Sequence, residues 1–290
     1  TVQYELQENI RRDLREQFAN AIRTKLDVTI NKKPIEKMFY QRIFDLGHLH
    51  DLTGYLKDVE MVFHLAGLPR VTESFETPIQ YEVSNVRSTL YLLMAMIEAK
   101  NTNLIVSSSS AIYGNPKQLP TPETAPVAPL SPYALQKFMS EQYALIIGEQ
   151  NGINVKVLRQ FNVYGPHSCD PKDSDNTSSS VINVFRHRKK CGQTIEVTGD
   201  GEQRRDFVNV NDVVEANYLA AISNKSGHVF NVGTGKTTSI NELAGMLANS
   251  WTYIPERIGE PRISHADISK IRDELSWKPR LTLKKSFNKN

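Results

Sequence analysis

The segment LIVSSSS at residues 104–110 decides the fold of this chain, because a short apolar run there ends abruptly in four serines. Two comparable segments are MVFHLAG at residues 61–67 and VKVLRQFNV at residues 155–163. Short runs rich in Val, Ile and Phe are typical of strands that are buried within a sheet. We therefore predict three buried strands at these positions.

Two segments with apolar residues at helical spacing lie between these strands, at residues 85–100 and 133–150. Strands that alternate with helices in this way form β–α–β units, in which the strands are parallel. We therefore predict an α/β fold with a Rossmann-like, doubly wound parallel sheet. Ligands of such sheets bind at the carboxyl ends of the strands, so the residues there are the first candidates for chemistry.

The sequence after residue 164 predicts a second, smaller α/β lobe. A polar loop at residues 165–180 precedes a helix-like run that ends at Cys191. The further predicted elements of this lobe are strands at 194–197, 207–210 and 228–233 and helices at 239–249 and 267–275. We therefore expect two domains, residues 1–164 and residues 165–290.

The composition excludes several classes of protein. The chain has 290 residues and is 39% apolar, which is enough for a substantial core. Its 35 basic and 32 acidic residues nearly balance, so the chain lacks the strong positive charge of a nucleic-acid-binding protein, and we expect no nucleic-acid partner. Cys169 and Cys191 form neither a disulfide framework nor a metal-spaced cluster, which favours a cytoplasmic protein without a metal. The apolar stretch at residues 91–99 is too short to cross a membrane, so we expect no membrane segment.

The first fifty residues lack a feature that a dinucleotide-binding sheet normally has. Such a sheet opens with a strand, a glycine-rich turn and a helix whose N-terminus holds the pyrophosphate. Residues 1–50 contain a single glycine, Gly47, and instead carry an amphipathic stripe that includes Ile10 and Phe18. We expect that the first strand and the glycine turn are missing here, through truncation or through degeneration of the start.

Tyr133 and Lys137 form the strongest candidate pair for chemistry. Ser131 and Pro132 precede them and are typical of the cap and the first position of a helix, so both side chains are expected on one helix face. A free tyrosine has a pKa of about 10, and a nearby fixed cation favours the phenolate. We therefore expect Lys137 to turn Tyr133 into a base that takes a proton from a hydroxyl group.

Several motifs of the chain, in the same order, resemble those of a known family. They are HLAGLPRVTESFETPIQYEVSNVRSTL, SSSSAIYG, SPYALQK, LRQFNVYGP, GDGEQRRDFVNVNDV, FNVGTG and PRISHADISK. They are similar to those of the extended short-chain dehydrogenase/reductases, and most similar to the NAD-dependent nucleotide-sugar 4-epimerases, over residues 43–290. The resemblance implies that residues 1–164 form an NAD-binding domain with an incomplete or degenerate start. It implies that residues 165–290 form a nucleotide-sugar-binding lobe.

The resemblance also implies roles for individual residues. The catalytic residues that it implies are Ser109, Tyr133 and Lys137. The implied NAD contacts, besides Tyr133 and Lys137, are Asp45, Leu46, Leu65, Ala66, Gly67, Asn85, Ser107 and Phe161. The implied contacts to the UDP-sugar substrate are Ser109, Asn162, Arg205, Arg257 and, near the 2-substituent of the sugar, Ser264.

The reaction that the resemblance implies is epimerisation at C4 of a UDP-sugar through a 4-keto intermediate. UDP-glucose and UDP-galactose or their N-acetylhexosamine counterparts are the expected substrates, and the small Ser264 leaves room for an N-acetyl group. Tyr133 takes the proton of the 4-hydroxyl group, NAD takes the hydride and returns it, and Ser109 holds the oxygen. Homodimers are common in the family, and the apolar faces of the helices at 85–100 and 133–150 allow one.

Two alternatives stay open. The 4,6-dehydratases carry an Asp–Glu pair directly after the serine, and uronate decarboxylases carry a glutamate there. This chain has Ser110 and Ala111 at those positions, so an elimination or decarboxylation lacks its proton carrier, which favours epimerisation. The other alternative is an inactive nucleotide-sugar-binding relative that cannot bind NAD because the glycine turn is missing.

Overall fold

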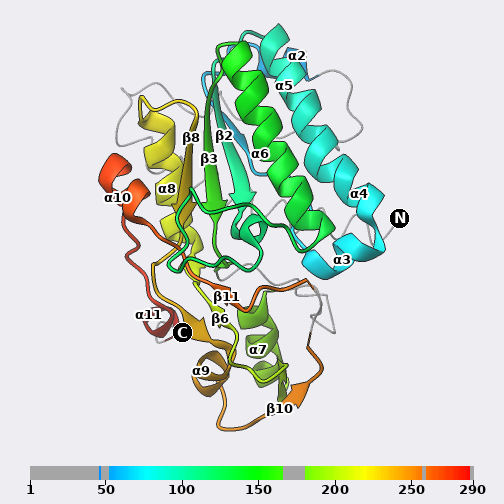
Figure 1. The fold of residues 1–290 in the computed structure, drawn as a ribbon, viewed down its shortest axis with the longest axis vertical. Helices are drawn as coiled ribbons and strands as arrows, with labels where there is room; N and C mark the ends of the chain where they lie inside the picture. Colours follow the sequence, from blue (N-terminus) through cyan, green and yellow to red (C-terminus); the bar gives the residue numbers. More distant parts are fainter. Residues whose placement is uncertain (1–45, 47–51, 166–179, 257–258, 288–290) are drawn as a thin grey trace.

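The computed structural model describes residues 46, 52–165, 180–256 and 259–287. Within them a main sheet is formed by β1 (Val62–His64), β2 (Asn103–Ser109), β3 (Asn154–Gln160) and β8 (His228–Val232). The order is β1-β2-β3-β8, and every neighbouring pair is parallel (Figure 1). The three strands and the parallel sheet predicted from the sequence are thereby confirmed.

Helices cover both faces of this sheet, because successive strand residues point to opposite sides. Leu104 and Val106 of β2 pack with α5 (Ser88–Glu98) and α6 (Pro132–Gln150). Ile105, between them, packs with α8 (Val210–Ile222) and α10 (Ser269–Leu275) on the opposite face. The doubly wound architecture is therefore confirmed, and the sheet lies between two helical layers.

The connection from β1 to β2 is mostly helical. Its helices are α3 (Val71–Glu76), α4 (Pro78–Glu82), the π-helix η2 (Val83–Arg87) and α5, and α2 (Thr53–Leu56) lies before β1. A π-helical turn inserted into an α-helix is rare and is frequent at functional sites. After β2, a short 3₁₀ helix, η3 (Ser110–Tyr113), leads toward α6.

The smaller lobe packs around its own core. Its strands are β4 (Val163–Tyr164), β5 (Ile195–Thr198), β6 (Arg204–Arg205), β7 (Val208–Asn209), β9 (Thr238–Ser239), β10 (Trp251–Ile254) and β11 (Ile263–Ser264). Its helices are α7 (Val181–Lys190), α9 (Ile240–Gly245) and α11 (Leu283–Phe287). β4 pairs with β7, β5 pairs with β10, and β6 lies between β9 and β11. Phe185, Val197 and Leu243 are buried between these elements.

One expectation about the lobes was wrong. We assigned residues 228–233 and 267–275 to the smaller lobe, whereas β8 extends the main sheet beside β3 and α10 covers it. The physical reason is that β3 presents a row of backbone donors and acceptors that an apolar strand can satisfy. The predictions for residues 1–45 and for Gly47 lie outside the described residues. No helix of the described residues is long and apolar enough to cross a membrane.

Candidate active site

The sequence-predicted residues converge on the carboxyl edge of the main sheet. Leu65, Ala66 and Gly67 directly follow β1, Ser107 and Ser109 end β2, and Phe161 and Asn162 follow β3. Because these strands are neighbours and parallel, their ends lie along one edge. The first turns of α6 pack against η3 and α3 at this same edge.

Tyr133 is held at this edge by the way that α6 begins. The hydroxyl group of Ser131 caps the helix by accepting a hydrogen bond from the Ala134 backbone N–H at 3.2 Å, and Pro132 occupies the first turn. The backbone N–H of Tyr133 donates to the Ser74 hydroxyl group of α3 at 3.1 Å. The Tyr133 side chain is therefore fixed at the helix start, as the sequence predicts.

The Ser109 hydroxyl group lies next to the Tyr133 phenol and interacts with it. Ser109 ends β2, and its hydroxyl oxygen also accepts a hydrogen bond from the Ala111 backbone N–H at 3.2 Å. Burial raises the pKa of the Tyr133 phenol above its ordinary value, and the nearby Ser109 hydroxyl group opposes part of that rise. We expected Lys137 to lower this pKa, but it is not among the causes of the shift, so the phenol of the free protein is neutral at pH 7.

Lys137 lies one turn after Tyr133 on the same face of α6. Burial lowers the pKa of its ammonium group to about 8, and the Glu141 carboxylate one turn further opposes that fall. Burial and, to a smaller extent, Lys137 lower the pKa of His64 on β1 to about 3, so this imidazole is neutral. A buried cation therefore lies at the sheet edge at neutral pH, close to the end of β1.

Asn85 of η2 holds the backbone that follows β1. Its side-chain oxygen accepts a hydrogen bond from the Leu68 N–H at 2.8 Å, and its side-chain nitrogen donates to the Leu68 carbonyl oxygen at 3.2 Å. A Cβ atom added at Gly67 would lie 2.7 Å from that same Asn85 oxygen. Only glycine leaves room for this close approach, which explains the small residues after β1.

The smaller lobe brings polar residues toward the same edge. Asn162 donates to the Asp206 carbonyl oxygen at 3.0 Å and to the Ser264 hydroxyl group at 3.3 Å. Arg205 of β6 is buried and pairs with Glu260 at 3.0 Å. A small cavity between the lobes is lined by nine residues, Ser264 among them. The structure therefore places Asn162, Arg205 and Ser264 on the side of the site formed by the smaller lobe.

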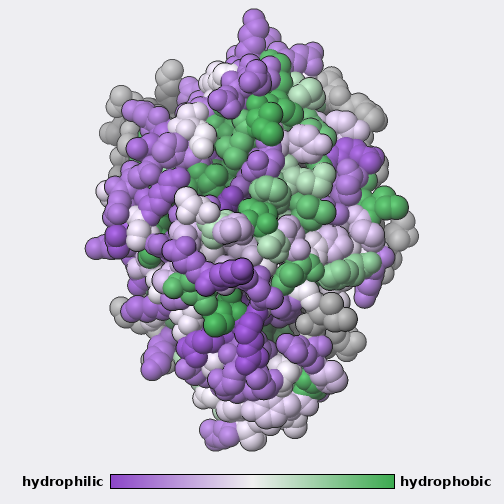
Figure 2. All heavy atoms as spheres, in the orientation of Figure 1, coloured by the Kyte–Doolittle hydropathy of each residue, from purple (hydrophilic) through white to green (hydrophobic). Residues whose placement is uncertain are grey.

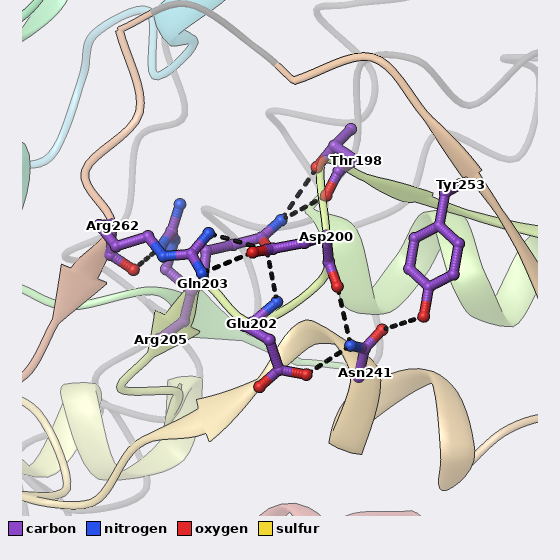
Figure 3. Close-up of polar contacts among 8 residues, drawn as sticks. All are labelled: Thr198, Asp200, Glu202, Gln203, Arg205, Asn241, Tyr253 and Arg262. Atoms are coloured by element: carbon purple, nitrogen blue, oxygen red, sulfur yellow. Dashed lines mark hydrogen bonds and ion pairs between the residues drawn. The ribbon is translucent and has the colours of Figure 1, made fainter.

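The loop around Arg205 is tied down by a polar network (Figure 3). Asp200 accepts two hydrogen bonds from the Arg262 guanidinium, both at 2.8 Å, and Asn241 donates to the Asp200 carbonyl oxygen at 2.9 Å. Arg205 also donates to the Arg262 carbonyl oxygen at 3.3 Å. The turn after β5 and the segment that leads into β11 are thus linked next to Arg205.

Four predicted site residues need separate mention. Asp45 and Arg257 lie outside the described residues. Leu46 is described and packs against the core formed with α5 and α6. The Phe161 side chain is only 1% exposed and packs beside Tyr113. It could contact a ligand only where it lines the small cavity.

Sequence reasoning missed two buried carboxylates near the site. Asp206 accepts hydrogen bonds from the backbone N–H groups of Thr234, Gly235 and Ala266, and so fixes the loop after β8 next to β11. Glu141 is fully buried and pairs with Arg159. Glu141 follows Lys137 by four residues, and this spacing could have indicated from the sequence that the two share a helix face. The spacing does not indicate that Arg159 of β3 pairs with Glu141. Among the described residues no cluster of potential metal ligands occurs.

The chain is similar to several known proteins. The model of the NAD dependent epimerase/dehydratase family matches residues 13–233. A putative UDP-glucose 4-epimerase from Methanocaldococcus jannaschii is 37% identical over 240 residues, with 80% of this chain and 76% of that protein covered. The structure of a UDP-N-acetylglucosamine 4-epimerase from Methanobrevibacter ruminantium, in complex with UDP-N-acetylmuramic acid, is 36% identical with a TM-score of 0.75 and covers 82% of this chain and 76% of that chain. MoeE5 in complex with UDP-glucose and NAD is 29% identical with a TM-score of 0.81 and covers 93% of this chain and 92% of that chain.

The close approach at Gly67 generates a prediction about stability. We expect Gly67→Ala to lower the free energy of unfolding by about 1–3 kcal/mol, because the added methyl group overlaps the Asn85 side chain. Urea denaturation measures the change, and Gly54→Ala is the matched control, since a Cβ atom there has nothing within 4 Å. Combining Gly67→Ala with Asn85→Ala should cost less than the sum of the single changes; strict additivity would contradict the proposed contact.

Proposed function

The chain belongs to the NAD dependent epimerase/dehydratase family, and we propose that it is an NAD-dependent epimerase that acts at C4 of UDP-sugars. The observation that carries the proposal is that Ser109, at the end of β2, and Tyr133, at the start of α6, interact at the carboxyl edge of the sheet, with Lys137 one helical turn further along α6. A hydroxyl pair beside a cation suits proton removal from a sugar hydroxyl group. UDP-glucose and UDP-N-acetylglucosamine are the two substrate types that the names of the relatives support.

The residues after Ser109 favour epimerisation over elimination. Ser110 and Ala111 form the first turn of η3, where an acid–base pair would have to stand for a 4,6-dehydratase. Neither side chain carries a carboxyl group, so a proton could not be delivered to a leaving hydroxyl group from these positions. The 4-keto intermediate would therefore be reduced again rather than dehydrated.

The carboxyl edge fits the nicotinamide end of NAD. Ala66 and Gly67 are small residues, and Asn85 holds the backbone at Gly67 and Leu68, so a ribose could approach this edge, where Lys137 supplies a buried cation. NAD, when bound, would accept the hydride from C4 of the sugar and return it to the opposite face. Ser107, Tyr133 and Phe161 complete the proposed cofactor contacts.

The protein's own residues carry the proton. Tyr133 would take the proton of the 4-hydroxyl group, and Ser109 would hold the same oxygen through its hydroxyl group. Burial raises the pKa of Tyr133 and Lys137 does not lower it in the free protein, so the phenolate would form only when the Lys137 ammonium group, one turn along α6, faces the phenol in the loaded site. The burial of this group also keeps water away from the intermediate.

The smaller lobe would hold the UDP part. Arg205 presents a guanidinium group whose fork suits a diphosphate, and Arg257 is the second arginine proposed for it. Asn162 links this lobe to the end of β3. In this proposal residues up to 164 bind NAD and the lobe that begins at residue 165 binds the nucleotide sugar, with α8 and β8 returning to the main sheet.

A homodimer is part of the proposal. The large apolar side chains of Met94 on α5 and Leu135, Tyr143 and Ile146 on α6 are exposed, and those on α6 recur at helical spacing. Figure 2 shows apolar side chains, coloured green, at the surface over these two helices. A second copy that presents the same two helices would form a four-helix contact and cover this surface.

A cytoplasmic location is also part of the proposal. Cys191 is free and exposed, which fits the reducing conditions of the cytoplasm.

Tyr133→Phe tests the catalytic assignment. We expect kcat for the interconversion of UDP-glucose and UDP-galactose to fall by a factor of about 10²–10⁴, because the base is removed, while the affinity for UDP stays nearly unchanged. Coupled assays measure the rate, and calorimetry measures UDP binding. Tyr143→Phe, on the exposed face of the same helix, is the matched control.

Two outcomes would overturn the assignment. An equal loss of activity and UDP affinity would mean that Tyr133 serves binding or folding. If denatured protein releases no NAD(H) and added NAD⁺ does not bind, the chain is a nucleotide-sugar-binding relative without the activity.

Ser264 generates a prediction about the sugar. This residue is nearly buried beside the small cavity, so replacement by tyrosine should exclude an N-acetyl group. We expect Ser264→Tyr to lower kcat/KM for UDP-N-acetylglucosamine by about 10–200-fold and to change the value for UDP-glucose much less. Failure of the unaltered protein to turn over UDP-N-acetylglucosamine, alongside rapid turnover of UDP-glucose, would refute the assignment.

The exposed face of α5 and α6 generates a prediction about assembly. Ile146→Glu should convert a dimer into a monomer, because a charge would be buried in the contact. Light scattering after size-exclusion chromatography measures the mass. Ile222→Glu on α8, which is equally exposed, is expected to leave the dimer intact. A monomeric unaltered protein would contradict the proposal.

A further inference from the structure

Behind the proposed catalytic residues lies a buried ion pair that the reaction described above does not use. Glu141 of α6 is 0% exposed and Arg159 of β3 is 5% exposed. The carboxylate accepts two hydrogen bonds from the guanidinium group, one from Nη2 and one from Nε at 3.1 Å. A buried pair gains little net stability over apolar residues of the same size, so a role beyond stability is worth seeking.

Hydrogen bonds from several neighbouring segments hold this ion pair in place. Ser108 of β2, the residue before Ser109, donates to the Glu141 carboxylate at 2.9 Å. The remaining guanidinium nitrogen of Arg159 donates to the Tyr113 hydroxyl group at 2.8 Å and to the Glu123 carbonyl oxygen at 2.9 Å. Tyr113 in turn donates to the Asn231 side chain of β8 at 2.7 Å. The carboxylate of Glu141 therefore has a single defined position.

That position is next to Lys137. Tyr133, Lys137 and Glu141 occupy successive turns of one face of α6, and the Lys137 ammonium group interacts electrostatically with the Glu141 carboxylate. The other titratable group that interacts with Lys137 in the described structure is His64 of β1, which is neutral and hydrogen-bonded to Thr89. Glu141 is therefore the anion that faces Lys137.

Resting on the proposed epimerase activity, we propose that Glu141 is a positioning residue that keeps Lys137 charged next to Tyr133, with Arg159 holding the carboxylate in place. The Lys137 ammonium group is buried, and burial favours its neutral form. Glu141 opposes this effect, and the outcome is a pKa of about 8. Without the Glu141 charge, the buried Arg159 cation would lose its partner and Lys137 would lose the anion that opposes its loss of charge.

The sign of the effect follows from this arrangement. Loss of the Glu141 charge lowers the pKa of Lys137 further, so the ammonium group is lost at a lower pH. The phenolate form of Tyr133 then loses its neighbouring cation, and kcat falls at neutral pH. Binding of UDP in the other lobe should not change.

The experiment compares the unaltered protein, Glu141→Gln and the double variant Glu141→Gln/Arg159→Met. Lysines are labelled competitively with a trace of an amine-reactive reagent across the pH range, and mass spectrometry measures how far each lysine has reacted. The pH dependence of labelling at Lys137 gives its titration midpoint without any need for activity. Lys156 is the internal control, because it is buried elsewhere and bonded to the Ser223 carbonyl oxygen. The pH profile of kcat is measured on the same samples.

We expect the Lys137 midpoint in Glu141→Gln to move to a lower pH, at which the proton concentration is at least about tenfold higher, and to move less in the double variant, which also lacks the Arg159 charge. The alkaline limb of the kcat profile should move by the same amount, and the Lys156 midpoint should stay fixed. If Glu141→Gln does not fold, because it leaves Arg159 unpaired, the double variant carries the test.

A folded variant with an unchanged Lys137 midpoint would overturn the inference and leave Glu141 with a structural role only. If the unaltered protein has no epimerase activity but the midpoint shifts as expected, the proposed function fails and the electrostatic role of Glu141 stands.

Discussion

The contact between the start of α6 and the end of β2 is the constraint on which the site depends. Ser131 and Pro132 determine where the helix begins, and the Ser74 hydroxyl group accepts the Tyr133 backbone N–H. This places the Tyr133 phenol within hydrogen-bond reach of Ser109. Because a helix repeats every 3.6 residues, Lys137 and Glu141 then follow on the same face without any further device. A helix that began one residue later would turn all three side chains by about 100°.

Burial shifts the two ends of this arrangement in opposite directions. It raises the pKa of the Tyr133 phenol and lowers the pKa of the Lys137 ammonium group to about 8, since both charged forms are disfavoured. In the free protein the phenol is neutral and the lysine is mostly charged at pH 7. Neighbours must therefore supply the charge balance that catalysis needs. Ser109 acts on the phenol and Glu141 acts on the lysine, each through a side chain fixed by the main sheet.

Local patterns in the sequence predicted much of this structure, because they depend on local physics. The buried strands, the helix at 133–150 and its cap follow from apolar spacing and from Ser131 and Pro132. The place of β8 could not be predicted, since an apolar strand does not specify its partner, and β8 pairs with β3 although residues 161–227 separate the two strands in the sequence. The pair of Glu141 and Arg159 was missed for the same reason, because the two residues meet only when α6 packs on the sheet. The pKa of Tyr133 was expected to fall, and it rises because burial outweighs its polar neighbours.

The fate of the hydrogen at C4 tests the central claim most directly. The protein would be incubated with UDP-glucose that carries deuterium at C4, and the product would be examined by NMR and mass spectrometry. The account predicts UDP-galactose that keeps the deuterium at C4, because the hydride leaves and returns within one closed site. Loss of the deuterium to water, its migration to C6 in a 4-keto-6-deoxy sugar, or the absence of any product with NAD bound would contradict the account.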